Sequence, residues 1–214
     1  ANLKSLGARP VVVGRLGDDP SGEALLQTFS RRGVSTSLIW TQRGYHTPTK
    51  TRILAGGSHS AKQQVVRIDQ GEPVPLTPGE EDLLLRNLAR GAAGAAGLLI
   101  SDYGYGLVHP GNVEAILRAA AEAKLPVVVD SRSQIPLYRG IAAAAPNLEE
   151  AEKATGIQVE GDPRRLEEVG SRLREITGAE AVMVTLGSRG LALFAKEEKP
   201  AHLPVFGTDE VADV

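Results

Sequence analysis

The chain has 214 residues, with 24 Lys and Arg against 26 Asp and Glu, which gives a formal net charge of −2 at pH 7. This balance argues against a nucleic-acid-binding protein, because a surface that binds the phosphate backbone of a nucleic acid normally has an excess of Lys and Arg. The sequence contains no cysteine, so disulfides and thiolate metal sites are excluded. Its apolar runs are too short to cross a bilayer. These properties predict a soluble, cytoplasmic, globular protein with neither a nucleic-acid nor a membrane partner.

Four short apolar runs are typical of strands that are buried on both faces of a parallel sheet. They occupy residues 10–16 (PVVVGRL), 97–101 (GLLIS), 126–130 (PVVVD) and 181–185 (AVMVT). Amphipathic segments with capping residues predict helices over residues 20–32, 78–89, 111–124 and 163–176. This alternation predicts an α/β fold with a doubly wound, mainly parallel sheet flanked by helices.

Residues 34–69 interrupt this alternation because they have no helical period. Strand-like pieces lie at 35–40, 47–54 and 63–69, and the Gly-rich segment between the last two predicts a hairpin turn. We expect residues 34–69 to form a small antiparallel β flap on an α/β body made of residues 1–33 and 70–214. A second hairpin, at 191–194 and 202–206, is expected within that body.

Ligands of open α/β sheets bind at the carboxyl ends of strands, so residues that follow a strand are the first candidates for a site. The strand that ends at Ile100 delivers Asp102 and a glycine-rich turn, which suits either a hydroxylated ligand or a local cap. The next strand delivers Asp130-Ser131-Arg132, for which a structural ion pair is the simpler interpretation.

Two further turns allow both a structural and a functional interpretation. Asn147 and Glu150 have the spacing of a reciprocal helix cap, which local physics favours, but the same groups could hold Mg²⁺ through water near a phosphate. Thr185, Gly187 and Gly190 suit either a phosphate-wrapping turn or a simple β-turn.

Common nucleotide and zinc motifs are missing from the sequence. Neither GxGxxG nor GxxxxGK[ST] occurs, so the dinucleotide and P-loop fingerprints are absent. The four histidines show neither HExxH nor another paired spacing, which argues against zinc. The function therefore has to be inferred from the order of the remaining motifs.

That order resembles the ribokinase-like PfkB family of sugar kinases over essentially the whole chain. The motifs are GxDxxG (Gly17, Asp19, Gly22), a β flap, SDYGxG, VVVDSR, PNxxE and VTLGxxG. In the flap, Lys50-x-Arg52 followed by QQxxRxD resembles more narrowly the heptose 7-phosphate kinase branch. The resemblance implies an ATP-dependent phosphotransferase whose product feeds ADP-heptose and lipopolysaccharide core synthesis.

The resemblance also implies roles for the positions that match the family's motifs. The implied sugar-binding positions are Asp102 and the flap residues Lys50, Arg52, Gln64 and Arg67, whose cations suit a phosphorylated substrate. The implied ATP-binding positions are Asn147, Thr185, Gly187 and Gly190. The implied metal positions are Glu150, which would hold Mg²⁺ through water, and Asp213, which would belong to a monovalent-cation site such as one for K⁺.

Other parts of the family pattern are expected outside these residues. The family's sugar-holding glycine pair and asparagine should precede Ala1, and its GAGD motif, with the catalytic aspartate, should follow Val214. Leu3, Leu6 and Gly7 likewise predict that the chain begins inside a helix. We therefore expect no catalytic base in this chain and no phosphoryl transfer by these residues alone.

Three functions stay open at this stage. Heptose 7-phosphate kinase is the leading hypothesis, although Tyr105 stands where that branch has lysine in DYxKG. The second is another kinase of the same family, for a ketohexose phosphate, 2-keto-3-deoxygluconate or ribose. The third is a non-catalytic nucleotide- or sugar-binding remnant. Because flaps of this family often pair between subunits, the resemblance also implies a homodimer through the flap.

Overall fold

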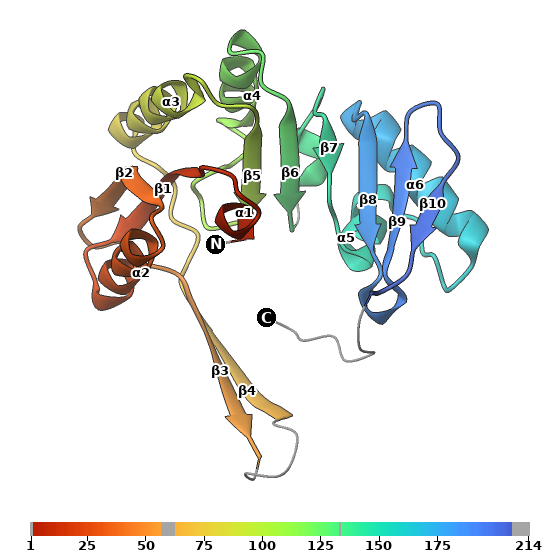
Figure 1. Cartoon of the computed structure of the whole chain (residues 1–214), viewed down its shortest axis with the longest axis horizontal. Coiled ribbons are helices and arrows are strands. Elements are labelled where there is room, and N and C mark those ends of the chain that lie inside the picture. Colours follow the sequence, from red (N-terminus) through yellow and green to blue (C-terminus); the bar gives the residue numbers. More distant parts are fainter. Residues whose placement is uncertain (1, 57–62, 133, 207–214) are drawn as a thin grey trace. The chain divides into compact units, whose positions relative to one another are not determined.

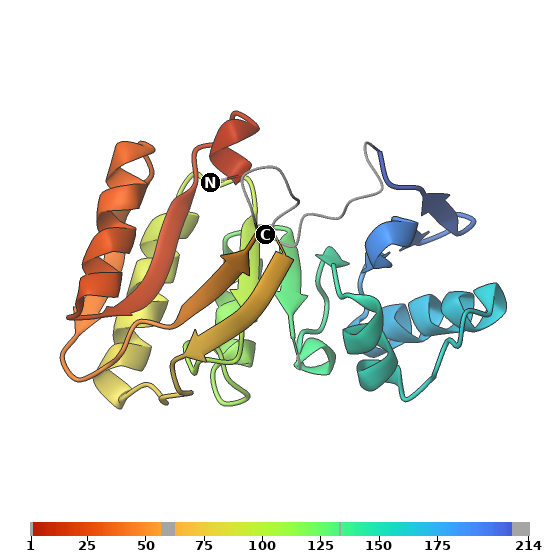
Figure 2. The ribbon, with the colours of Figure 1, turned by 90° about the horizontal axis from the view of Figure 1, so that it is seen from below.

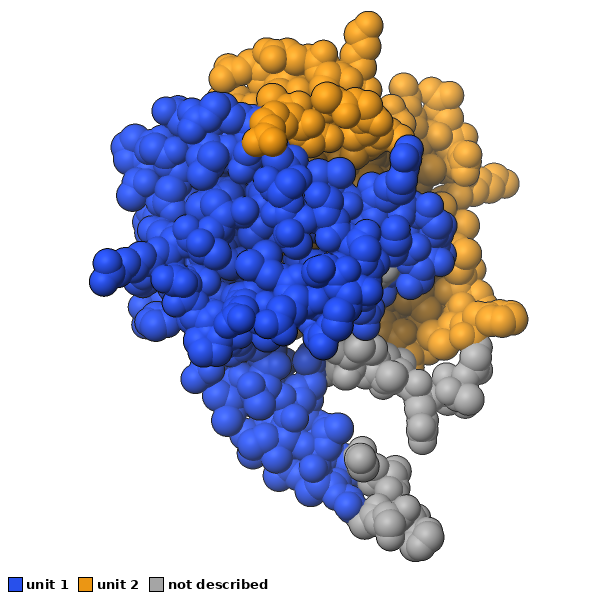
Figure 3. Space-filling view, turned by 60° about the vertical axis from the view of Figure 1, so that its left-hand side comes forward, with its two compact units in different colours: residues 1–87, 105–107 blue, residues 88–104, 108–214 orange. Residues whose placement is uncertain are grey.

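The computed structural model describes residues 2–56, 63–132 and 134–206, which divide into two compact units (Figure 3). Unit 1 comprises Ala1–Asn87 and Tyr105–Leu107, and unit 2 comprises Leu88–Gly104 and Val108–Val214. The predicted cation position Asp213 lies outside the described residues.

Unit 1 carries the first helices and strands of the chain. In chain order these are α1 (Asn2–Ser5), β1 (Val11–Gly17), α2 (Pro20–Arg31), β2 (Ser35–Gln42), β3 (Thr49–Ala55), β4 (Gln63–Gln70) and the larger part of α3 (Pro78–Ala92). α2 begins as the sequence predicts, because the Asp19 side chain accepts the Gly22 N–H at 2.7 Å and Pro20 occupies the first turn.

β1 and β2 pair in parallel, and α2 packs against both strands (Figure 2). Two successive strands joined by a helix can run in parallel because the helix returns the chain to the edge where it started. Leu16 and Leu38 are buried in this unit at 7% and 4% exposure. The expected antiparallel flap over residues 34–69 therefore differs from the structure: Ser35–Gln42 belongs to a parallel pair, and the antiparallel part begins at Thr49.

β3 and β4 form an antiparallel hairpin that extends away from the rest of unit 1 (Figure 1). Its register places Ile53 opposite Val66, so apolar side chains gather on one face of the hairpin. The same register places Arg52 opposite Arg67 on the other face. Every residue of β4 is exposed. The apolar face and the charged face of the hairpin are therefore both little covered by the rest of unit 1.

Unit 2 carries the remaining elements. In chain order these are β5 (Leu98–Asp102), α4 (Val113–Glu122), β6 (Val127–Ser131), the 3₁₀ helix η1 (Ile135–Leu137), β7 (Ala143–Ala144), α5 (Leu148–Thr155), α6 (Pro163–Thr177), β8 (Ala181–Thr185), the 3₁₀ helix η2 (Gly187–Arg189), β9 (Leu191–Ala195) and β10 (Ala201–Leu203). No helix in the described parts of the chain is long and apolar enough to cross a membrane.

These strands form one sheet in the order β10-β9-β8-β7-β6-β5. β5 to β8 run in parallel, and β9 and β10 add an antiparallel edge. Val129, Val182 and Val184 on the strands and Leu173 on α6 are fully buried, and α6 packs against β8 and β9. The structure thus confirms the predicted α/β architecture with a mainly parallel sheet.

Candidate functional site

The candidate site of unit 2 lies at the carboxyl ends of its parallel strands. The register places Asp102 of β5 beside Ser131 of β6. Asn147 and Thr185 form an isolated parallel bridge, and the Thr185 N–H donates to the Pro146 carbonyl at 2.9 Å. The structure therefore brings together two of the predicted nucleotide positions, Asn147 and Thr185, and places Asp102 on the same edge of the sheet.

Asp102 is the most enclosed carboxylate of this edge, with 5% of its surface exposed. Its Oδ2 accepts hydrogen bonds from Ser131 Oγ at 2.8 Å and from the Tyr138 hydroxyl at 2.9 Å. Its Oδ1 accepts the Gly104 N–H at 2.9 Å. The local interpretation of Asp102 is confirmed, because Oδ1 fixes the turn through Gly104. The role in binding a hydroxylated ligand stays a prediction, for which the carboxylate has spare acceptor capacity.

Two ionisable groups beside Asp102 have shifted pKa values. Burial raises the pKa of Tyr138 far above its usual value of about 10, and the charge and hydrogen bond of Asp102 act in the same direction. Burial also raises the pKa of Asp130, which the nearby Arg132 opposes and Asp102 reinforces. Tyr138 thus stays a protonated donor at any physiological pH.

The Asn147–Glu150 segment forms the reciprocal cap of α5. The Glu150 N–H donates to Asn147 Oδ1 at 2.8 Å, and the Asn147 N–H donates to Glu150 Oε2 at 2.9 Å. Within residues 2–56, 63–132 and 134–206, no group of three or more His, Asp or Glu side chains could hold a metal ion. A cation held here by protein ligands alone is therefore not supported by the described residues.

The turn after β8 contains two glycines with different surroundings. Gly187 has φ +61°, and a Cβ built on it would meet nothing within 4 Å. Gly190 has φ +86°, and its Cβ would meet the Leu203 carbonyl oxygen and Pro204 of the following hairpin. Gly187 therefore leaves the backbone accessible to a ligand, whereas Gly190 allows β9 and β10 to approach the turn.

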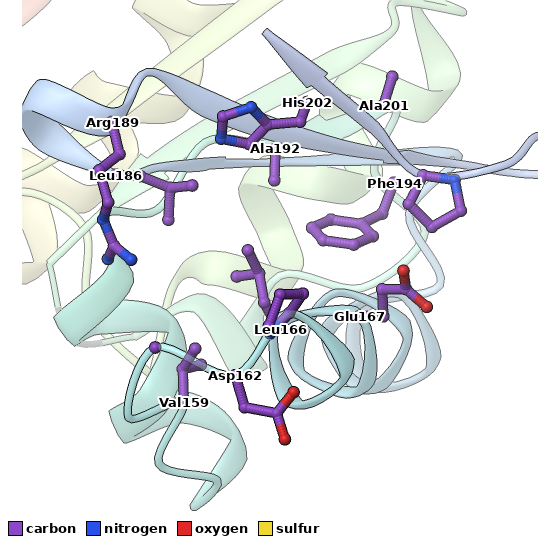
Figure 4. Close-up of a pocket in the computed structure, with 13 residues that line it drawn as sticks. Val159, Asp162, Leu166, Glu167, Leu186, Arg189, Ala192, Phe194, Ala201 and His202 are labelled. Atoms are coloured by element: carbon purple, nitrogen blue, oxygen red, sulfur yellow. The ribbon is translucent and has the colours of Figure 1, made fainter. Parts of the chain in front are cut away.

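A cavity of about 290 Å³ lies beside this turn, between α6 and the β9–β10 hairpin (Figure 4). Leu186 and Arg189 of the turn line one side of it. Leu166 from α6 and Phe194 from β9 point into the space between these elements (Figure 4). The charged residues Asp162 and Glu167 also line it (Figure 4).

In unit 1, the β3–β4 hairpin carries all four predicted flap residues. Lys50 lies opposite Asp69, Arg52 lies opposite Arg67, and Gln64 lies opposite Leu54 near the far end of the hairpin. Arg67 forms an ion pair with Asp69 at 3.1 Å. The hairpin thus brings Lys50, Arg52 and Arg67 onto one face.

The GxDxxG motif fixes the chain segment that leads into this hairpin. Asp19 accepts the Thr47 N–H at 2.7 Å in addition to capping α2, and the Gly17 N–H donates to Thr47 Oγ1 at 2.9 Å. A Cβ on Gly17 or Gly22 would collide with neighbouring backbone atoms, which explains both glycines. The motif therefore links β1 and α2 to the base of β3.

Asp19 gives a pH-dependent prediction. Although burial opposes its ionisation, hydrogen bonds from the Thr47 and Gly22 N–H groups hold the pKa of Asp19 below its usual value near 4. Its contribution to the free energy of unfolding is therefore present above about pH 4 and is lost as the pH falls through the lowered folded pKa. Asp19→Ala should reduce stability by about 1–2 kcal/mol at pH 7.

Urea denaturation at pH 7 and pH 3 tests this linkage. The difference between Asp19→Ala and the wild type should shrink at the lower pH, because the wild-type carboxylate is then partly protonated. Asp18→Ala is the matched control at the exposed neighbouring position. An equal difference at both pH values would contradict the assigned role of the charge.

Ser131 and Tyr138 belong to the site although the sequence does not single them out. The sequence pattern places Ser131 in a turn for which an ion pair of its neighbours is the simpler interpretation. Its position at the end of the strand next to Asp102 is a signal that could have found it. Tyr138 lies 36 residues from Asp102 in the chain, and no local pattern marks that contact.

Comparison with known proteins gives matches over the whole chain. The family model described as the pfkB family carbohydrate kinase matches residues 1–214. The bifunctional protein HldE of Pelobacter propionicus is 37% identical over 214 residues, which are 100% of this chain and 42% of that protein. HldE of Geobacter metallireducens is 36% identical over the same shares of the two chains. The chain thus spans about two-fifths of the length of these curated relatives.

Solved structures match the fold. Ribokinase of Arabidopsis thaliana, complexed with ribose and ATP, has a TM-score of 0.67 at 21% identity, over 94% of this chain and 62% of that chain. Phosphofructokinase-2 from Escherichia coli, in complex with fructose-6-phosphate, has a TM-score of 0.69 at 16% identity, over 94% and 64%. These similarities confirm the expected ribokinase-like fold.

Proposed function

Because this chain belongs to the pfkB family of carbohydrate kinases, we propose that it acts in the ATP-dependent phosphorylation of heptose 7-phosphate in the cytoplasm. The flap motif supports this branch of the family. The 37% identity with HldE of Pelobacter propionicus over the whole chain supports it as well. The phosphorylated product would feed ADP-heptose and lipopolysaccharide core synthesis.

The observation that carries the substrate class is the pairing of Arg52 with Arg67 on one face of the hairpin. Like charges directly opposite each other destabilise a two-stranded sheet, and an anion bound between them removes that repulsion. Lys50 adds a third cation to this face, opposite the carboxylate of Asp69. Arg52 Nε has no hydrogen-bond partner among the described residues. A sugar phosphate supplies such an anion.

We assign Mg·ATP to the turns at Asn147 and Thr185. Thr185 is exposed and Gly187 leaves its backbone accessible, which suits contact with phosphate oxygens. Glu150 uses Oε2 in the α5 cap and has a second oxygen for a metal-bound water, in keeping with the preference of Mg²⁺ for retained waters. Bound Mg²⁺ would neutralise charge on the transferred phosphoryl group.

We assign Asp102 to recognition of the sugar hydroxyls. Its carboxylate is ringed by donors that leave part of Oδ1 available, which suits an acceptor of hydroxyl hydrogen bonds. Within the described residues we assign none as the general base that accepts the proton of the attacking hydroxyl.

Substitution of Arg67 tests the phosphate assignment. In the intact protein, Arg67→Ala should raise the KM for heptose 7-phosphate about 10- to 100-fold with little change in kcat, because a hydrogen bond to a charged group contributes about 1.5–3 kcal/mol. Steady-state kinetics with saturating Mg·ATP measure this. Arg31→Ala, on the exposed end of α2, is the control and should leave KM unchanged. An unchanged KM in Arg67→Ala would refute the phosphate role.

We also propose that two copies of the chain pair through the β3–β4 hairpin. Ile53, Val66 and Ile68 share its apolar face and expose 47%, 44% and 45% of their surfaces. A second hairpin would cover this face and the free strand edges. Light scattering should give twice the protomer mass for the wild type and the protomer mass for Ile68→Lys. A monomeric wild type would contradict the pairing.

A further inference from the structure

Two buried side chains hold the Asp102 carboxylate, and the proposed reaction does not use either of them directly. Ser131 and Tyr138 are both 0% exposed, and both donate to the same oxygen, Oδ2. Ser131 Oγ also accepts the Gln134 N–H at 3.2 Å, so its own hydrogen is committed to Asp102. Oδ2 is thus turned toward the interior of unit 2 and saturated.

The other oxygen of the carboxylate keeps acceptor capacity. A carboxylate oxygen offers about two acceptor positions, and Oδ1 accepts one hydrogen bond among the described residues, from the Gly104 N–H. One position on Oδ1 therefore remains for a ligand. The two donors to Oδ2 define the direction of that position because they prevent the carboxylate from rotating.

The chemistry of the two donors matters as much as their position. Ser131 and Tyr138 are neutral, so they orient the carboxylate without cancelling its charge. A hydroxyl that donates to an ionised carboxylate makes a hydrogen bond about twice as strong as one to a neutral acceptor. Tyr138 follows η1 in the connection between β6 and β7, so this connection contributes a donor to the end of β5.

We propose that Tyr138 and Ser131 are positioning residues for sugar recognition, which hold Asp102 so that Oδ1 accepts a hydrogen bond from a substrate hydroxyl. The inference rests on the proposed sugar-binding role of Asp102. Loss of either donor frees the carboxylate to rotate, which weakens the bond to the sugar. It leaves the nucleotide turn at Asn147 and Thr185 unchanged.

The test uses steady-state kinetics and sugar-binding calorimetry on the intact protein with Tyr138→Phe and Ser131→Ala. Each variant should raise the KM and the Kd for heptose 7-phosphate about tenfold, with kcat within about twofold of the wild type and the KM for ATP unchanged. A merely structural role would instead reduce the active fraction, which lowers kcat without changing the sugar KM. Tyr45→Phe removes a hydroxyl from a buried tyrosine of unit 1 and is the matched control.

The possible outcomes separate this inference from the proposed function. A sugar KM within twofold of the wild type in the folded variants overturns the positioning role. If Tyr138→Phe fails to fold, the sugar KM of Ser131→Ala alone tests that role. A wild type that binds ribose or a ketohexose phosphate in place of heptose 7-phosphate changes the proposed substrate, and the variants are then compared on that sugar. A wild type that binds no sugar overturns both proposals before any variant is measured.

Discussion

Replacement of Arg15 by alanine is expected to lower the free energy of unfolding by about 3–5 kcal/mol, because it removes the cation from a buried polar cluster. The Arg15 side chain is 1% exposed. Its Nη2 donates to the carbonyls of Val74 at 2.6 Å and Tyr105 at 3.4 Å. Its Nη1 donates to Gln42 Oε1 at 3.0 Å and lies 3.8 Å from Glu80 Oε1. In Arg15→Ala, the two carbonyls and the side chains of Gln42 and Glu80 lose the guanidinium as their donor, and buried polar groups left unpaired cost free energy.

Urea denaturation followed by tryptophan fluorescence measures this effect in unit 1, because Trp40 in β2 is the only tryptophan of the sequence. Arg15→Lys is the informative control, since lysine keeps the charge but lacks the planar fork and the stacking of the guanidinium 4.0 Å from the Tyr45 ring centre. The free energy of unfolding of Arg15→Lys should lie between that of the wild type and that of Arg15→Ala. If Arg15→Ala has the same free energy of unfolding as the wild type, the polar cluster around Arg15 contributes little to stability, which would contradict this prediction.

The second large effect is expected for Gly190→Ala in the turn after β8. Gly190 has φ +86° and ψ −133°, a region that residues with a Cβ avoid. The added Cβ would also collide with the Leu203 carbonyl oxygen, which is backbone and has no flexible side chain to move aside. We expect a loss of about 3 kcal/mol and weaker binding of Mg·ATP, because the turn that holds Thr185 must shift.

Gly187→Ala provides the matched control in the same turn. Its φ of +61° disfavours alanine, but the Cβ meets no atom within 4 Å, so we expect a loss of only about 1 kcal/mol. Chemical denaturation of both variants, with ATP titrations in the presence of Mg²⁺, compares them directly. Equal losses in the two variants would contradict the assigned contact between Gly190 and the β9–β10 hairpin.

The fold of unit 2 could be predicted because its strands are short apolar runs between amphipathic helices. Burial on both faces was not found, because burial alternates along β5, β6 and β8 and Leu99 of β5 is 51% exposed. The runs at residues 126–130 and 181–185 are continuously apolar, and they became β6 and β8 with Val129 and Val182 fully buried. The direction of β2 could not be predicted in the same way. Its sequence resembles a flap strand, and only its pairing with β1 across α2 places it in a parallel sheet.

The candidate site shows the same division between local and distant contacts. The cap formed by Asn147 and Glu150 spans three residues and follows from spacing alone. Ser131 and Tyr138 reach Asp102 across 29 and 36 residues, so only the fold brings them together. The pairing of Arg52 with Arg67 also required the hairpin register, which a bulge near Leu54 shifts by one residue.

We propose above that this pfkB-family kinase uses the cationic face of its flap to select a phosphorylated heptose. The most direct measurement is kcat/KM of the intact protein, with Mg·ATP, for heptose 7-phosphate, fructose phosphates, ribose and 2-keto-3-deoxygluconate. We expect heptose 7-phosphate to be preferred by at least about tenfold over the unphosphorylated sugars, in line with one charged hydrogen bond. A higher kcat/KM for ribose or 2-keto-3-deoxygluconate, or no phosphoryl transfer to any of these sugars, would contradict the claim.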